Sequence, residues 1–192
     1  MDAPFFVPLA ILGPGVILTI CLHYSEVGKR RAIKKATGGR LSTRVGGMLL
    51  EAEPKGLPVN VTLMEAKNNT LYNRAKVTVA VSLIPSADFY VGPAGALSKP
   101  LGLLFSGLSP CNLALPWLGD WVIQGEPAKA VETALSKVDS LDGFKKADWR
   151  PVHLVCRDNR LEILVETRWA FAPENVKALL DMSADLAFRL MG

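Results

Sequence analysis

The side chains that most often do chemistry are few in this chain. It has two histidines, His23 and His153, and neither has a second ligand at the spacing that a metal site requires. Ser106 and Ser109 have no evident histidine and carboxylate beside them, so they lack the base that activates a nucleophile. We therefore interpret His153 as a strand residue, and His23 as a residue of the membrane headgroup region next to Tyr24.

Phosphate-binding and acidic motifs are weak as well. The run GPAGALSKP lacks the GxxxxGK[ST] spacing of a phosphate-binding loop, and neither GxGxxG nor GxSxG occurs. Glu51 and Glu53, and likewise Glu162 and Glu166, have the spacing of residues on one face of a strand, which is typical of a solvated sheet face. The sequence thus predicts no catalytic residue, no cofactor and no metal site.

Residues 1–25 are predicted to be a transmembrane anchor. No charged residue lies between Ala3 and Tyr24, and roughly 20 apolar residues at about 1.5 Å each span the ~30 Å hydrocarbon layer of a bilayer. A cleaved signal peptide would need a basic start and a small-residue cleavage site, a core helix would be shorter, and an interfacial helix would show a polar stripe. Gly13 and Gly15 predict a kink there and permit close contact with helices of other subunits.

Residues 26–44 are predicted to be a basic juxtamembrane helix, ending near residue 37, and a linker. Seven Lys and Arg and no acid lie between residues 29 and 44. Because such residues stay on the cytoplasmic side of a span, we expect a cell-membrane protein with its N-terminus outside and its C-terminal domain in the cytoplasm. The residues expected to meet anionic lipid headgroups are Lys29, Arg30, Arg31, Lys34 and Lys35. The alternative is that these charges only set the topology.

Residues 45–192 are predicted to be one cytoplasmic α+β domain. They hold 15 Lys and Arg against 16 Asp and Glu, so the basic pI of 9.0 belongs to the preceding segment. A nucleic-acid-binding domain would carry basic surface on its folded part, so no nucleic-acid partner is expected. The three cysteines have no CxxC spacing, which indicates free thiols in a reducing compartment.

Hydrophobic patterns in this domain predict a mostly antiparallel sheet, made of a meander and a hairpin and covered by helices. Period-two alternation marks the strands, and apolar steps of three and four residues mark the helices. The expected strands are 45–53, 58–66, 74–84, 120–124, 151–157 and 160–169. One helix is expected after Pro127 and another over residues 173–191. Strands that cluster apart from helices and are joined by hairpins indicate an α+β fold.

The apolar stretch 101–118 is the second unusual segment, since no charged residue lies between Lys99 and Asp120. Its glycines and prolines would break a lipid-exposed helix, so a second span is not expected. Two interpretations are left open. The stretch is either a loop folded over the sheet as part of the core, or an exposed surface that docks on the membrane or a partner subunit through Phe105 and Trp117.

The layout of one outside-to-inside span followed by a cytoplasmic α+β domain is similar in topology to the heavy subunit of bacterial photosynthetic reaction centres. The resemblance implies a protein that caps a membrane complex without doing its chemistry. With the anchor, the apolar stretch 101–118 and the missing catalytic constellation, it favours a non-catalytic accessory subunit, whose partners are anionic lipids and other subunits. A membrane-tethered cytoplasmic binding module for a soluble partner or small ligand is the alternative, and a tethered enzyme ranks lowest.

Overall fold

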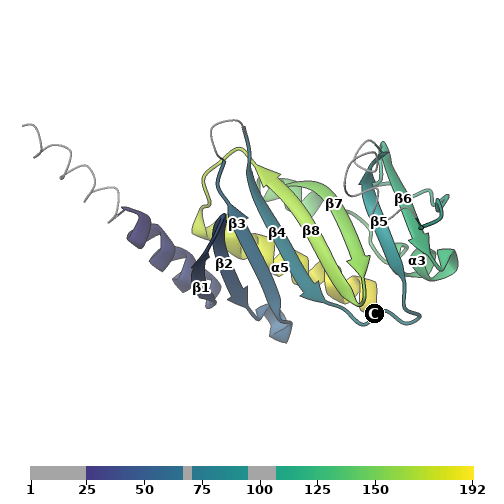
Figure 1. The fold of residues 1–192 in the computed structure, drawn as a ribbon, viewed down its shortest axis with the longest axis horizontal. Helices are drawn as coiled ribbons and strands as arrows, with labels where there is room; N and C mark the ends of the chain where they lie inside the picture. The colour runs from purple at the N-terminus through teal and green to yellow at the C-terminus, as the bar shows by residue number, and fades with distance from the viewer. Residues whose placement is uncertain (1–24, 67–70, 95–106) are drawn as a thin grey trace, which may run out of the picture.

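The computed structural model describes residues 25–66, 71–94 and 107–192, which form an α+β fold around an antiparallel sheet (Figure 1). The strands are β1 (Arg40–Arg44), β2 (Gly47–Ala52), β3 (Val59–Met64), β4 (Asn73–Ala80), β5 (Asp88–Pro93), β6 (Trp121–Glu126), β7 (Arg150–Arg157) and β8 (Arg160–Thr167). The helical elements are residues 25–37, the 3-10 turn η1 (Pro54–Gly56), α3 (Ala128–Leu135), α4 (Asp142–Lys146) and α5 (Pro173–Met191). The strand order is β1-β2-β3-β4-β8-β7-β5-β6.

The predicted anchor lies outside the described residues apart from its last position, and so do Gly13 and Gly15. Among residues 25–66, 71–94 and 107–192, no helix is both long and apolar enough to cross a bilayer. Residues 67–70, between the expected strands 58–66 and 74–84, are outside the described part as well. The α+β class and the antiparallel sheet are therefore confirmed, whereas the span stays a prediction.

One face of the sheet carries the core because apolar residues alternate along the strands. Leu50, Val61, Val77 and Ile163 stand opposite one another on β2, β3, β4 and β8, and all four are fully buried. Burying one such side chain stabilises the fold by about 1.5–3 kcal/mol. Helix α5 runs across this face (Figure 1). The predicted meander, the hairpin and the C-terminal helix are thus confirmed.

The folded part begins earlier than residue 45. Residues 40–44, expected to be a linker, form β1 and pair along their whole length with β2. Gly46 lies in the turn between β1 and β2 and has a φ of +93°, which glycine adopts without strain. Upstream, Ile33 from the helix at residues 25–37 has no exposed surface and belongs to the core. This helix is therefore part of the domain.

Two elements between the meander and the second hairpin were not predicted. Strand β5 lies before the apolar stretch 101–118 and joins β7 to β6. Helix α4 lies between α3 and β7, and Trp149, shortly after it, is buried. The Trp149 indole N–H donates to the Asn175 carbonyl at 2.9 Å, and its ring stacks on Phe171 with centroids 6.1 Å apart. Trp149 thereby ties the sheet to the start of α5.

Candidate functional site

Two of the five predicted lipid-facing residues contact the folded domain. Lys29 Nζ lies 3.1 Å from the carboxylate of Glu65, just after β3, and Arg30 Nη1 donates to Thr43 Oγ1 of β1 at 2.9 Å. These contacts are on the surface, so each is worth no more than about 1 kcal/mol. Together they fix how the helix at residues 25–37 is rotated against the sheet.

The other three predicted lipid-facing residues are available for a partner. Arg31, Lys34 and Lys35 are exposed, and their spacing of three and four residues places them on one side of the helix. Ile33 is buried on the opposite side. The helix therefore presents a basic outer side while its inner side is fixed in the core.

The surroundings of Trp117 combine features of the two open interpretations of the 101–118 stretch, because its side chain is partly in the core and partly exposed. It is half-buried against the core, and its indole N–H donates to the Val138 carbonyl at 2.6 Å. Backbone hydrogen bonds of 2.9 Å join Cys111 to Ile123 and Ser109 to Gly125, so this part of the chain covers the outer edge of β6. Phe105 lies outside the described residues.

A hollow of about 550 Å³ opens beside this loop. Its lining includes Trp117 and Trp121, the cations Lys145 of α4 and Arg150 at the start of β7, and the carboxylates Asp120 and Asp142. Aromatic walls with a few polar groups are typical of small-molecule sites. The hollow was not foreseen, because its walls come from segments far apart in the sequence.

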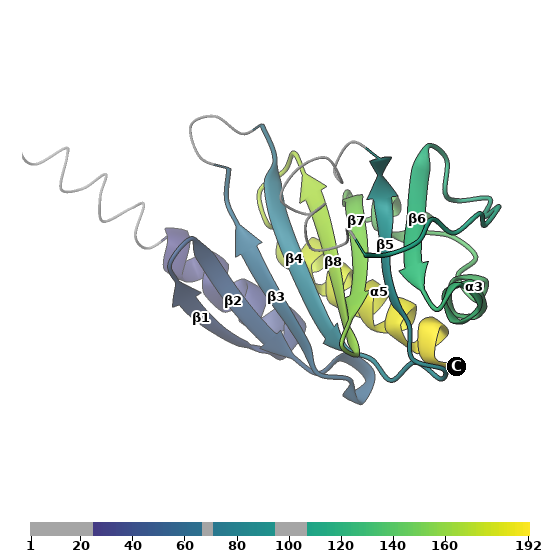
Figure 2. The ribbon, with the colours of Figure 1, turned by 45° about the vertical axis from the view of Figure 1, so that its right-hand side comes forward.

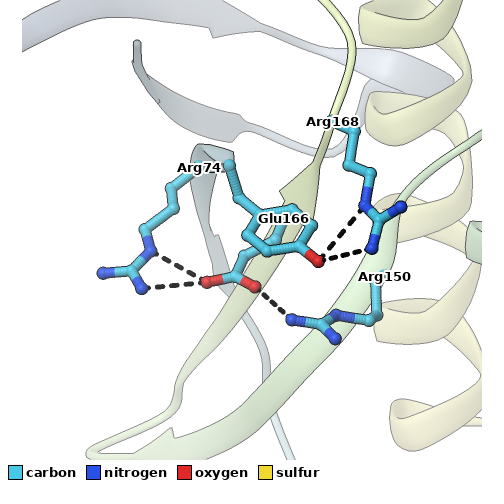
Figure 3. A network of polar contacts seen from close by, with 5 residues as sticks. Arg74, Arg150, Glu166 and Arg168 are labelled. Carbon is cyan, nitrogen blue, oxygen red and sulfur yellow. Dashed lines mark hydrogen bonds and ion pairs between the residues drawn. The ribbon is translucent and has the colours of Figure 1, made fainter. Parts of the chain in front are cut away.

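The most organised polar contacts lie where three strands meet at one end of the sheet (Figure 3). Arg74, Glu166 and Arg150 stand side by side on β4, β8 and β7. Arg74 Nε and Nη2 both lie 2.9 Å from Glu166 Oε1, and Arg150 Nη2 lies 2.6 Å from Oε2. A buried carboxylate needs such partners, because desolvation of a charge costs several kcal/mol. The solvated-face interpretation of Glu166 was therefore wrong, since its side chain is 6% exposed.

A tyrosine links this cluster to a third arginine. The Tyr72 hydroxyl oxygen accepts hydrogen bonds from Arg168 Nε at 3.2 Å and Nη2 at 2.9 Å. The guanidinium carbons of Arg150 and Arg168 lie 5.0 and 5.3 Å from the Tyr72 ring centroid, within cation–π range. In the described part of the chain, Arg168 makes no ion pair. Its charge is free to meet an anion in the adjoining cavity of about 290 Å³.

His153 is buried on the sheet face opposite the α5 layer, with its ring 6.0 Å from that of Tyr90. Its Nε2 has no hydrogen-bond partner among the described residues. Burial is the main cause that lowers the His153 pKa; Glu162 opposes this shift and Lys76 adds to it. A buried imidazole in this setting is held neutral.

The buried His153 predicts a pH-dependent stability. The folded-state pKa lies below the unfolded value, so the unfolded chain binds more protons and stability should fall as the pH drops from about 7.5 to about 5.5. Urea unfolding of the full chain across this window measures the slope. His153→Gln should flatten it, and an unchanged slope in that variant would assign the effect to other groups.

The two described cysteines, Cys111 and Cys156, predict an order of chemical modification. Cys156 is fully buried, and burial, with a contribution from the Asp88 charge, raises its pKa to about 12. Cys111 is half-buried, and burial raises its pKa too. Because the thiolate is the reactive form, iodoacetamide should modify Cys111 of the folded chain before Cys156, which reacts only in urea. Peptide mass spectrometry measures both; early modification of Cys156 would contradict its burial.

Comparisons of the chain with protein-family models, with curated proteins and with solved structures found no match. Among residues 25–66, 71–94 and 107–192, no three His, Cys, Asp or Glu side chains lie close enough together to hold a metal ion. Within residues 25–66, 71–94 and 107–192, the candidate sites are the docked basic helix, the aromatic hollow and the arginine cluster around Glu166.

Proposed function

We propose that this chain is a single-pass membrane protein and a non-catalytic accessory subunit of a membrane complex. Residues 1–25 span the cell membrane with the N-terminus outside, and the α+β domain lies in the cytoplasm. The apolar run without charge and the basic residues after it support this placement. The domain extends from the helix at residues 25–37, here named the membrane-exit helix, to the C-terminus.

The observation that carries the proposal is the burial of Ile33. A domain joined to its anchor by a flexible linker samples many orientations. Here the helix that follows the apolar run is fixed by Ile33 in the core, by Lys29 and by Arg30. A rigid join suits a subunit that sits at one position in an assembly, because its contact surfaces keep a fixed direction relative to the membrane.

Extraction of native membranes with a mild detergent tests the subunit assignment. The chain of 20.7 kDa should migrate in a larger assembly on native electrophoresis, and mass spectrometry should identify its partners. Gly13→Leu with Gly15→Leu should weaken that assembly, because glycine permits close helix approach. Gly28→Leu is the matched control, since Gly28 is exposed with open space around it. Migration as a single chain in its micelle would refute the proposal.

A membrane-tethered binding module is the second candidate, favoured by the hollow between Trp117, Trp121, Lys145 and Arg150. Asp120 and Asp142 line the hollow as well, so its two indoles, two cations and two carboxylates suit a small ligand with an apolar part and charges of both signs. Native mass spectrometry of the purified full chain should then show a bound small molecule that Lys145→Gln releases. A ligand-free spectrum would argue against this function. Any shortened chain should start at residue 25, because a start at 45 removes Ile33 and β1.

A further inference from the structure

The cluster around Glu166 lies at the same end of the molecule as the start of the membrane-exit helix. Met64, Arg74, Glu166 and Arg150 follow one another across β3, β4, β8 and β7. Glu65, the next residue after Met64, holds Lys29 of the first helical turns. Figures 1 and 2 show the purple helix at residues 25–37 with its first turns toward the end of the sheet where β3 and β8 finish and β4 starts.

Two large apolar side chains project from this end into solvent. Leu71 is 86% and Trp169 is 64% exposed. Hydrogen bonds hold the Trp169 backbone in place: its carbonyl accepts from Asn73 Nδ2 at 2.7 Å, and its N–H donates to Thr167 Oγ1 at 3.2 Å. The backbone that carries the exposed Trp169 side chain is therefore held in place.

Arg150 and Arg168 line the same cavity as Trp169. Arg74 and Arg150 share Glu166, and their side chains remain 50% and 64% exposed. Among the described residues, Arg168 donates its side-chain hydrogen bonds to the neutral Tyr72 hydroxyl. The nearby Asp148 offsets one charge, which leaves a local excess of one positive charge. Guanidinium groups bind phosphate oxygens through paired N–H donors, and tryptophan is enriched at membrane–water interfaces. The chemistry of a phospholipid headgroup layer matches this combination.

We propose that Leu71, Tyr72, Arg74, Arg150, Arg168 and Trp169, here named the end patch, form a second contact with the membrane. The inference rests on the proposed membrane anchor. Trp169 and Leu71 enter the headgroup region, and Arg168 and Arg150 bind phosphates of anionic phospholipids. The anchor supplies attachment, and the end patch fixes the tilt of the domain. Its occupant is the lipid surface of the bilayer in which the anchor lies.

Tryptophan quenching by brominated lipids tests the contact in the full chain, reconstituted in phosphatidylcholine vesicles with and without phosphatidylglycerol. Trp169 is isolated as the difference between the wild type and Trp169→Phe. The matched control adds Ile84→Trp to Trp169→Phe, because Ile84 is 85% exposed beyond the opposite end of β4. We expect strong quenching of Trp169 by lipids brominated near the headgroup, more with phosphatidylglycerol, and little quenching of the control.

Arg168→Gln separates the charge contribution from the apolar one. Loss of one basic residue near an anionic surface should weaken the binding of the end patch to the lipid surface by about fivefold in vesicles with phosphatidylglycerol. The change should be small in pure phosphatidylcholine. Equal weakening in both lipids would contradict phosphate binding by Arg168.

The outcomes also separate this inference from the proposed function. If the chain resists alkaline carbonate extraction but Trp169 is quenched no more than the control tryptophan, the anchor stands and the end patch is not a membrane contact. If carbonate releases the full chain from the vesicles, both proposals fail. Strong quenching of Trp169 in a carbonate-resistant chain supports both.

Discussion

Trp149→Ala should lower the free energy of unfolding by about 3–5 kcal/mol. Trp149 is 1% exposed. Its removal leaves a cavity against Phe171 and deprives the Asn175 carbonyl of its indole donor. Urea unfolding of the full chain in detergent micelles, followed by far-ultraviolet circular dichroism, measures the change without relying on tryptophan emission.

Trp169→Ala is the matched control for this prediction. The same side chain is removed from an exposed position, so the free energy of unfolding should change by less than about 0.5 kcal/mol. Similar losses in the two variants would show that Trp149 does not join α5 to the sheet as described.

Ile33→Ala should produce a second large effect, a loss of about 2–5 kcal/mol in the free energy of unfolding. The side chain has no exposed surface and is the fully buried contribution of the helix at residues 25–37 to the core. Its truncation should also release this helix from the sheet. Hydrogen exchange across residues 25–37 should therefore become faster, while exchange in β4 and β8 changes less.

Lys34→Ala and Lys35→Ala test the specificity of that effect. Both lysines are exposed on the other side of the helix, so each substitution should leave the stability within about 0.5 kcal/mol of the wild type. If Ile33→Ala behaves like these controls, the helix is not docked and the rigid join loses its support.

The elements with a clear period were predictable from the sequence. Strands β3 and β4 alternate because one face is buried and the other is polar, and α5 repeats its apolar residues at helical steps. Strand β5 has no such alternation, since Phe89, Tyr90 and Val91 are all buried. Strand β1 is polar because it lies at the edge of the sheet, where charged residues are common.

The candidate sites were less predictable, because they depend on the order of the strands. The arginine cluster requires β8 to lie between β4 and β7, and no local pattern specifies this insertion. Glu162 and Glu166 have the same spacing signal, yet Glu162 is half-buried beside Lys76 and Glu166 is buried between two arginines. The basic residues 29–35 were identified, but their division between domain contacts and an exposed side follows from the burial of Ile33.

Alkaline carbonate extraction of membranes that contain the full chain tests the membrane span most directly. Carbonate strips peripheral proteins, whereas a chain held by about 20 apolar residues in hydrocarbon stays with the lipid. We predict that the full chain remains in the membrane pellet and that a chain lacking residues 1–24 appears in the supernatant. Recovery of the full chain in the supernatant would contradict the anchor and the accessory role built on it.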